Sequence, residues 1–209
     1  MNLRDSIKQL QRELGVEVDG TAGPVTISNA LSVIRSLRRE EPESTDELPK
    51  DAQEILFDER TEKVLATLDA KAAPLFRQFL ARAQATAATL GCDYRLIGGT
   101  RTFAEQDALY AQGRTKPGGI VTKARGGYSN HNFGIAVDAG VFLGGGYVDE
   151  MNPALASKVH RACSMHAPSC GLEWGGSWKS IVDMPHYQVE TGKTTAQLRE
   201  LFKTKGRVL

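Results

Sequence analysis

The 209-residue sequence lacks any hydrophobic run near the roughly 18 apolar residues that a membrane span needs. Its N-terminus, MNLRDSIKQLQREL, carries charges where a secretory signal needs an apolar stretch, so we expect a protein made and held in a cytoplasm, without membrane insertion. Cysteines are few, and an odd number of them without an export signal argues against a disulfide framework. They are Cys92, Cys163 and Cys170. With 41% hydrophobic and 24% charged residues, the chain can still bury a core.

The net charge of +1 is also small, but charges of one sign are gathered in separate parts of the chain. Residues 1–37 are neutral, whereas residues 38–62 contain ten acidic and four basic side chains, a net charge of −6. Residues 63–209 contain 18 basic and 11 acidic side chains, a net charge of +7. A basic body of this kind favours a polyanionic partner without identifying it.

The same three parts define the expected domains. The acidic segment 38–62 is rich in Glu, Asp, Pro, Ser and Thr, a composition that cannot bury enough apolar surface to fold and indicates a linker. In the head, residues 1–37, apolar residues at helical spacing flank a turn rich in Gly and Asp, which predicts two short helices. In the body, residues 63–209, strands and helices follow one another without regular βαβ alternation, which predicts an α+β domain.

Within the body, the pattern predicts an Ala-rich amphipathic helical run over residues 61–90, interrupted near Pro74. CDYRLIGGTR reads as a strand, and TFAEQDALYAQGR as a helix that opens with a capping box of Thr102 and Glu105. FGIAVDAGVF predicts a second strand, residues 153–166 a helix, and HYQVE a last strand followed by a short helix.

Two histidines are paired in sequence with carboxylates, His131 with Asp138 and His186 with Asp183. A zinc hydrolase needs about three His or carboxylate ligands, an open position for water, and a separate carboxylate that takes the proton. A single buried histidine more often only hydrogen-bonds a neighbour, so a metal site is indicated by the two histidines together with their carboxylates and not by either histidine alone. His131, Asp138 and His186 could supply the ligands, with Asp183 as the base.

Local geometry imposes a condition on this set. Residues seven apart in an unbroken strand point to opposite faces, so His131 and Asp138 can share a metal only if the strand is irregular between them. Gly134 offers a place for the irregularity. Pro185 similarly excludes a regular helix through DMPH.

A second group of metal-ligand residues has the spacing H-x2-C-x2-H-x3-C. It comprises His160, Cys163, His166 and Cys170. Structural zinc sites usually take two ligand pairs from separate segments, whereas these four residues lie within eleven and mostly on one expected helix. We therefore interpret the cysteines as packing groups.

The order S-x-H-x6-D, then a Trp- and Gly-rich stretch, then D-x-x-H resembles the M15 zinc peptidases. That family includes D-alanyl-D-alanine carboxypeptidases and dipeptidases and phage L-alanyl-D-glutamate endopeptidases. The resemblance covers residues 90–190, including GGTRTFAEQDALYAQGR. Many members have Glu where Asp183 stands, whereas the phage endopeptidase branch has Asp. The matching residues are Arg101, Ser129, His131, Asp138, Glu173, Trp174, Gly175, Gly176, Trp178, Asp183 and His186.

The resemblance implies a D-alanyl-D-alanine-peptidase-like domain, also found in Hedgehog proteins, with a small antiparallel sheet and flanking helices. It implies one Zn²⁺ ion, with Asp183 taking the proton of the attacking water and Arg101 stabilising the charge on the tetrahedral intermediate. The implied ligands are His131, Asp138 and His186, and Ser129 and Trp178 are expected to contact substrate.

Simpler interpretations stand beside these roles. Arg101 could merely pair with Glu105 across one helical turn. Trp174 and Trp178 are large apolar groups that could belong to the core.

The head resembles the peptidoglycan-binding helical module of many cell-wall hydrolases, through the order LQxxLG, DGxxGPxT and AL. The residues concerned are Leu10, Gln11, Leu14, Gly15, Asp19, Gly20, Gly23, Pro24, Thr26, Ala30 and Leu31. An ordinary helical hairpin used for dimerisation or docking is the alternative.

Together these features predict a phage-type endolysin that cuts the L-Ala–D-Glu bond of peptidoglycan stem peptides. We expect a monomer that binds peptidoglycan and no nucleic acid, held in the host bacterial cytoplasm until release to the wall. The alternatives are a D-alanyl-D-alanine carboxypeptidase of the same family and a non-catalytic zinc-containing wall-binding protein. A glycosidase that uses Glu173 and Asp183 as paired carboxylates would leave His131 and His186 without a role.

Overall fold

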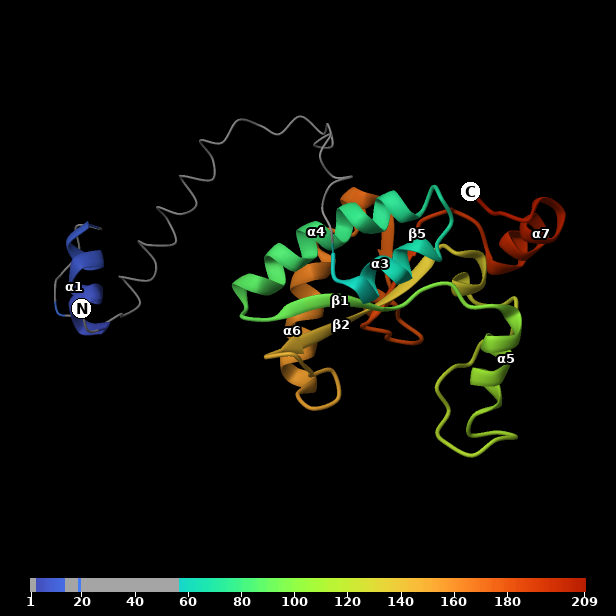
Figure 1. Cartoon of the computed structure of the whole chain (residues 1–209), viewed down its shortest axis with the longest axis horizontal. Coiled ribbons are helices and arrows are strands. Elements are labelled where there is room, and N and C mark those ends of the chain that lie inside the picture. Colours follow the sequence, from blue (N-terminus) through green and yellow to red (C-terminus); the bar gives the residue numbers. More distant parts are fainter. Residues whose placement is uncertain (1–2, 14–18, 20–56) are drawn as a thin grey trace. The chain divides into compact units, whose positions relative to one another are not determined.

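The computed structural model divides the chain into two compact units, Met1–Pro49 and Lys50–Leu209, and describes residues 3–13, 19 and 57–209 (Figure 1). In the first unit, helix α1 (Leu3–Glu13) is the first of the two helices expected in the head. The buried Gln11 of α1 donates a hydrogen bond from Nε2 to Asp19 Oδ1 at 2.7 Å. The second expected helix, most of the wall-binding motif and the acidic segment up to residue 56 lie outside the described residues.

The second unit contains every other described element. Its α-helices are α3 (Glu59–Ala66), α4 (Ala73–Thr89), α5 (Phe103–Ala111), α6 (Pro153–Ser164) and α7 (Thr195–Lys205). Its short 3₁₀ helices are η2 (Asn130–Phe133), η3 (Pro168–Cys170) and η4 (Gly175–Ser177). Its strands are β1 (Asp93–Gly98), β2 (Ala136–Leu143), β3 (Gly146–Tyr147), β4 (Leu172–Trp174) and β5 (His186–Val189).

The strands form one antiparallel sheet in the order β1-β2-β5-β4, with β3 paired to β2. The expected α+β fold with a small antiparallel sheet and flanking helices is therefore confirmed. The expected break at Pro74 is also present, because α3 ends at Ala66 and Pro74 lies in the first turn of α4. Thr102 and Glu105 form the expected capping box of α5. Among the described helices, none is long and apolar enough to span a membrane.

The two faces of the sheet differ in character because side chains alternate along each strand. On one face, Val137 and its neighbours pack into the core beneath α4 and α6, where the rings of Phe79 and Tyr187 lie 4.4 Å apart. Tyr94 on the same face meets His160 of α6 through a 2.7 Å hydrogen bond. Asp138 and His186 alternate with these core residues, so the opposite face carries the polar side chains.

The sequence places the end of the linker at Glu62, and the structure moves this boundary toward the N-terminus. Helix α3 begins at Glu59, capped by Asp58, whose side chain accepts from the backbone N–H of the buried Thr61. The hydroxyl of Thr61 in turn accepts from the backbone N–H of Leu96 in β1. Residues 57–62 are therefore an ordered part of the second unit, which begins at Lys50. The acidic composition does not predict this order, because the contacts that stabilise these residues are made with Leu96 and Arg77, which are distant in the sequence.

Glu62 tests this boundary. Its carboxylate accepts two hydrogen bonds from Arg77 of α4, at 2.8 and 2.6 Å, and these hold the pKa of Glu62 below its usual range. We expect Glu62→Gln to lower the free energy of unfolding at neutral pH by about 1 kcal/mol, because the ion pair is partly exposed. A carboxyl with a depressed folded-state pKa stabilises above its unfolded pKa, so the difference should vanish as acid protonates wild-type Glu62. Urea denaturation at neutral and acidic pH measures it, and equal stabilities at neutral pH would contradict the assignment.

Candidate active site

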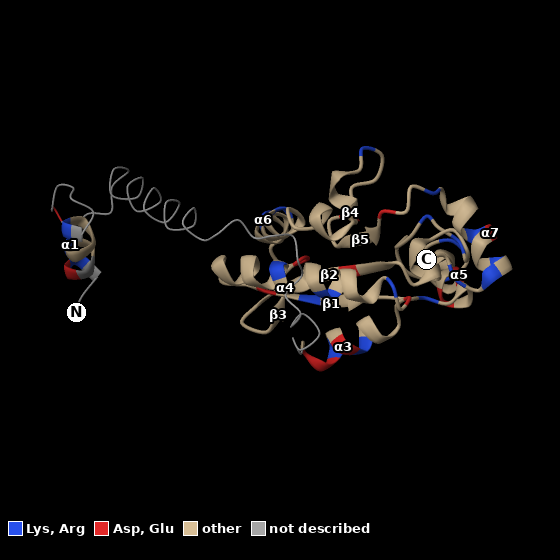
Figure 2. Ribbon diagram, turned by 90° about the horizontal axis from the view of Figure 1, so that it is seen from above, with Lys and Arg blue, Asp and Glu red and all other residues tan. Residues whose placement is uncertain are grey.

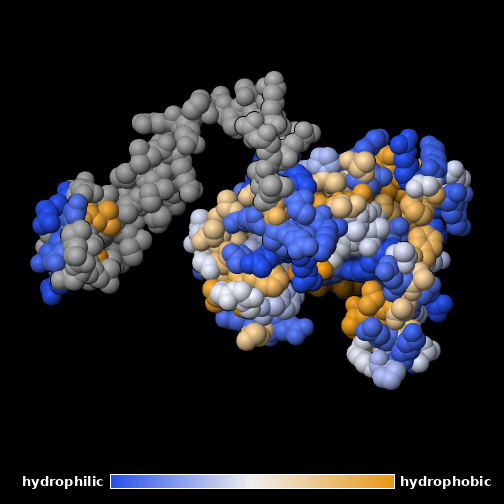
Figure 3. Space-filling view, viewed as in Figure 1, coloured by the Kyte–Doolittle hydropathy of each residue, from blue (hydrophilic) through white to orange (hydrophobic). Residues whose placement is uncertain are grey.

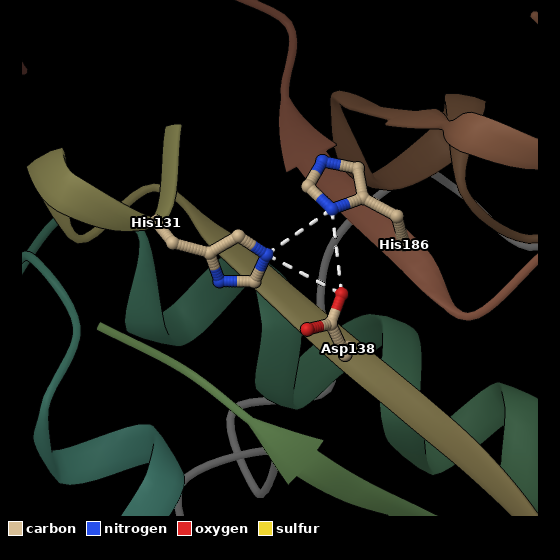
Figure 4. Close-up of side chains that lie close together, drawn as sticks. All are labelled: His131, Asp138 and His186. Atoms are coloured by element: carbon tan, nitrogen blue, oxygen red, sulfur yellow. Dashed lines mark hydrogen bonds and ion pairs between the residues drawn. The ribbon is translucent and has the colours of Figure 1, made fainter. Parts of the chain in front are cut away.

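The three side chains expected to bind metal converge on one point (Figure 4). His131 Nε2 lies 3.2 Å from His186 Nδ1 and 3.3 Å from Asp138 Oδ1, and His186 Nδ1 lies 3.4 Å from the same carboxylate oxygen. Both imidazoles are buried, and Asp138 is largely so. No other cluster of this kind occurs among the residues that the structure describes.

The backbone explains how residues from distant parts of the chain meet. Asp138 of β2 and His186 of β5 are direct cross-strand partners. His131 lies in η2, which ends at Gly134 with φ of 70°, so the chain turns before β2 begins. A Cβ at Gly134 would also lie 2.8 Å from the backbone nitrogen of Asp69. The irregularity expected at Gly134 is therefore confirmed, and it allows His131 and Asp138 to face each other.

The outer hydrogen-bond partners of the two imidazoles favour, for each neutral ring, the tautomer whose hydrogen points away from this cluster. His131 Nδ1 lies 2.8 Å from the carbonyl oxygen of Gly99, which can only accept, so the neutral ring carries its hydrogen on Nδ1 and a lone pair on Nε2. His186 Nε2 lies 3.0 Å from Gln188 Oε1, which likewise leaves its Nδ1 unprotonated. In their neutral forms, the two imidazoles thus turn nitrogen lone pairs toward a carboxylate oxygen, an arrangement that a cation would neutralise.

The spacing of these atoms also fits a metal ion. Zinc binds imidazole nitrogen and carboxylate oxygen at about 2.0–2.1 Å, so two ligands of a tetrahedral ion are about 3.3 Å apart. The observed separations of 3.2, 3.3 and 3.4 Å match that edge length. Three ligands of this type leave one tetrahedral position open, as catalytic rather than structural sites do.

The pKa values of two carboxyl groups at the site, Asp138 and Asp183, are shifted in opposite directions. Burial raises the pKa of Asp138, but the charges and hydrogen bonds that His131 and His186 supply when protonated outweigh it and hold this pKa well below its usual range. Burial lowers the pKa of His186, and Asp138 more than compensates, so that pKa is raised. Burial also raises the pKa of Asp183, and there it prevails. Of the two carboxyls, Asp183 therefore takes up a proton at the higher pH.

Arg101 contacts the second oxygen of Asp138. Its Nη2 donates to Asp138 Oδ2 at 2.5 Å, and its Nη1 donates to Gln106 Oε1 at 3.3 Å. Glu105 instead uses its carboxylate for the capping box of α5, so the simpler pairing of Arg101 with Glu105 is not the one observed. Arg101 retains further guanidinium hydrogens for a substrate oxygen.

Asp183 precedes β5 and lies in the same cleft as the three-residue cluster. Its backbone N–H donates to Gly175 O at 3.1 Å, and its carbonyl accepts from the backbone N–H of His186 at 3.3 Å. A Cβ at Gly175 would come within 2.7 Å of Asp183 O, so only glycine allows η4 to approach this closely. Pro185 ends any helix here, and the chain enters β5 directly.

The cleft has a volume of about 1130 Å³. It contains both expected substrate contacts, Ser129 and Trp178. The Trp178 ring lies 5.1 Å from that of His186, whereas Trp174 packs against the core, so the two tryptophans have different roles. The remaining functional side chains in the lining include Arg101, His131, Asp138, Asp183, His186 and Gln188.

The rim of the cleft combines apolar and basic groups. Ile120 and Val121, on the loop after α5, are 61% and 60% exposed and line the cleft, as does Lys123. Figure 3 shows a hydrophobic surface on the side of this projecting loop that faces the sheet. Figure 2 shows Lys and Arg on α7, whereas Asp and Glu mark the start of α3. The rim could hold a peptide backbone between apolar walls and attract anionic groups.

The second group of potential metal ligands does not form a site. His160 is bound by Tyr94 and by Asp149 at 2.7 Å, and His166 by Thr86 at 2.8 Å. Cys163 and Cys170 are buried free thiols. The interpretation of these cysteines as packing groups agrees with the structure.

Three polar side chains that the sequence analysis did not single out support the site. The fully buried Gln106 links Arg101 to the loop after α5 by donating to Ala124 O, and Asn132 donates to Arg101 O. Gln188 accepts from His186. The period-two alternation of HYQVE, which places Gln188 on the face of His186, would have found the last of these. Nothing in the local sequence marks the other two.

Comparisons with known proteins agree on one family. A family model described as D-alanyl-D-alanine carboxypeptidase matches residues 122–189. The peptidoglycan L-alanyl-D-glutamate endopeptidase CwlK of Bacillus subtilis (strain 168) is 40% identical over 121 residues, covering 56% of this chain and 72% of CwlK.

Two solved structures are also similar. The L-Ala D-Glu endopeptidase ChiX of Serratia marcescens is 24% identical with a TM-score of 0.42, covering 67% of this chain and 93% of ChiX. A zinc-bound vancomycin resistance D,D-pentapeptidase VanY is 14% identical with a TM-score of 0.39, covering 67% of this chain and 80% of VanY. Because the identity to CwlK extends over 72% of that protein, this chain belongs to the M15 family of zinc peptidases and is a metallopeptidase.

Proposed function

We propose that this chain is a zinc-dependent endopeptidase that hydrolyses the L-Ala–D-Glu bond of peptidoglycan stem peptides. The observation that carries the proposal is the cluster of His131, Asp138 and His186, whose separations match the edges of a tetrahedral metal site. The 40% identity to an L-alanyl-D-glutamate endopeptidase supports the choice of bond.

The proposed chemistry divides among the residues of the cleft. A bound Zn²⁺ would polarise the scissile carbonyl and lower the pKa of water to about 7. Asp183, whose pKa burial raises, accepts the proton of the attacking water and passes it to the leaving amine. Arg101, held by Asp138 and Gln106, directs its remaining N–H groups toward the oxygen that becomes negative.

A second candidate is the D-alanyl-D-alanine carboxypeptidase activity named by the matching family model. The two activities need the same cluster and differ in the bond that the cleft presents to it. Mass spectrometry of digested peptidoglycan separates them. New N-terminal D-glutamate supports the endopeptidase, and free D-alanine without an internal cut supports the carboxypeptidase. Undiminished digestion after chelation and metal-free dialysis would refute both.

Neither a non-catalytic wall-binding protein nor a glycosidase accounts for the site equally well. Asp183 and Arg101 line the same cleft as the ligand cluster, which a purely structural metal does not require. Glu173, the second carboxylate of the glycosidase alternative, already accepts hydrogen bonds from Trp178 and Gln188. Reducing ends released by the purified protein would revive the glycosidase.

Arg101 provides a test of the proposed oxyanion contact. Lysine cannot bind Asp138 and Gln106 simultaneously in the fork geometry of a guanidinium. We expect Arg101→Lys to lower kcat/KM on peptidoglycan fragments by about 10²–10³-fold. Zinc content, measured by atomic absorption, should stay near one ion per chain. Activity within about threefold of wild type would contradict the role.

The lytic context is a further part of the proposal. The resemblance of residues 1–37 to a wall-binding module and the +7 charge of residues 63–209 support action on an anionic cell wall, as a phage-type endolysin does. Sedimentation with purified cell walls tests the head. The full chain should co-sediment more strongly than a variant lacking residues 1–37, and equal binding would leave the head without this role.

A further inference from the structure

A chain of hydrogen bonds leads from His186 to Glu173, outside the cluster itself. Gln188 Oε1 lies 3.0 Å from His186 Nε2, and Gln188 Nε2 donates to Glu173 Oε2 at 2.8 Å. Glu173 of β4 and Gln188 of β5 are direct cross-strand partners, and Gln188 lies two residues after His186 on the same face. The sheet therefore aligns a carboxylate, an amide and an imidazole in one row.

The chemistry of these groups determines where their hydrogens lie. An ionised carboxylate has only acceptors, so Glu173 binds the NH₂ group of Gln188 and turns its carbonyl toward His186. That carbonyl also accepts from Asn130 Nδ2 at 2.7 Å, which occupies its second lone pair. With an acceptor beside Nε2, neutral His186 carries its hydrogen there and keeps the Nδ1 lone pair for the cluster.

Asn130 shows that this orientation has a cost. Its own Oδ1 is buried, and among the buried side-chain oxygen and nitrogen atoms of the described residues it alone has no hydrogen-bond partner. Turning the Asn130 amide around would place its oxygen against the oxygen of Gln188. Asn130 Oδ1 therefore stays without a partner because the Asn130 amide is oriented to donate from Nδ2 to Gln188 Oε1.

Glu173 also holds the other side of His186. Its Oε1 accepts from Trp178 Nε1 at 2.7 Å, and the Trp178 ring packs 5.1 Å from the imidazole, tilted by 48°. One carboxylate thus fixes both the amide that orients the His186 hydrogen and the indole that limits rotation of the ring.

We propose that Glu173 is a positioning residue that, through Gln188, locks His186 in the tautomer and orientation needed to bind metal. The inference rests on the metal-binding part of the proposed function. Outer partners of metal-bound histidines typically change metal affinity by about 10–100-fold when mutated. Glu173→Gln is the decisive variant because it keeps the shape and most hydrogen-bonding capacity but is no longer an acceptor only.

Two readouts test the proposal in the full chain. We expect Glu173→Gln to weaken Zn²⁺ binding by about 10-fold or more in competition with a chromophoric chelator. In the metal-free protein, at a pH high enough for His186 to be neutral, ¹⁵N NMR should show wild-type His186 with its hydrogen on Nε2 and a mixture of tautomers in the variant. Gln188→Met, which removes the amide and leaves Glu173 intact, should reproduce both changes and serves if Glu173→Gln does not fold.

Matched variants separate positioning from general stability. Glu62→Gln removes a partly exposed carboxylate from an ion pair with Arg77 and should leave both readouts unchanged. Trp178→Phe keeps an aromatic ring at this position and removes the N–H, so it should alter Zn²⁺ affinity less than Gln188→Met does. Unchanged affinity and unchanged His186 nitrogen shifts in Glu173→Gln would overturn the proposal. Absence of Zn²⁺ binding by the wild type would instead refute the proposed function, and the metal-free NMR comparison would still decide this inference.

Discussion

Asp138→Asn should abolish hydrolysis and reduce Zn²⁺ affinity by more than about 100-fold, the upper end of the effect of outer partners. The two carboxylate oxygens of Asp138 have different partners: Oδ1 faces His131 and His186, whereas Oδ2 accepts from Arg101. An amide has only one oxygen. It must turn its NH₂ either toward the guanidinium, where two donors would meet, or toward the cluster, where it cannot bind a cation. Either orientation also removes the negative charge.

The measurement is chelator competition for Zn²⁺ together with release of stem-peptide fragments from purified peptidoglycan. Asp93→Asn is a matched control, since Asp93 lies on the adjacent strand β1 and forms only an exposed pair with Arg95. We expect that control to keep wild-type affinity and activity. Asp138→Asn protein that retained stoichiometric zinc and hydrolysed peptidoglycan would contradict the ligand assignment.

Parts of the site could be predicted from the sequence because their signals are local and chemically distinctive. His131 and Asp138 can face each other only if the strand is irregular between them, and Gly134, with its positive φ, provides that irregularity. The capping box of Thr102 and Glu105 and the helix restart at Pro74 are similarly local, and both are confirmed. These features depend on side-chain chemistry within a few residues, which one sequence can show.

The parts that escaped prediction depend on contacts between distant residues. Strand β4 has only three residues, too few for a period, and it exists because Glu173 pairs with Gln188 of β5. Acidic composition near Glu62 indicates a linker until Arg77, fifteen residues later, is placed beside it. The buried Gln106 resembles any polar helix residue in the sequence. The head beyond α1 and the roles assigned to the site residues stay predictions.

The prediction for Asp183 separates catalysis from metal binding. We expect Asp183→Asn to lower kcat by about 10²–10⁴-fold, the range that a positioned general base contributes, while zinc content stays at the wild-type level. Asparagine has the same shape but cannot accept the proton of the attacking water. Zinc should be retained because Asp183 is outside the described cluster of His131, Asp138 and His186. Loss of zinc together with activity, or activity close to that of wild type, would contradict the assignment.

Stability gives Asp183→Asn a second signature that a structural residue would not show. Burial raises the pKa of Asp183, so at neutral pH the ionised carboxyl opposes folding of the metal-free protein. The neutral asparagine removes that cost, and the variant should melt at the same temperature as wild type or higher. A raised folded-state pKa means that the cost disappears as the pH falls from the folded toward the unfolded pKa. The two melting temperatures should therefore converge in acid. Burial raises the pKa of both carboxyls, but the protonated imidazoles outweigh it at Asp138 alone, and opposite shifts of this kind match a ligand and a base within one cleft.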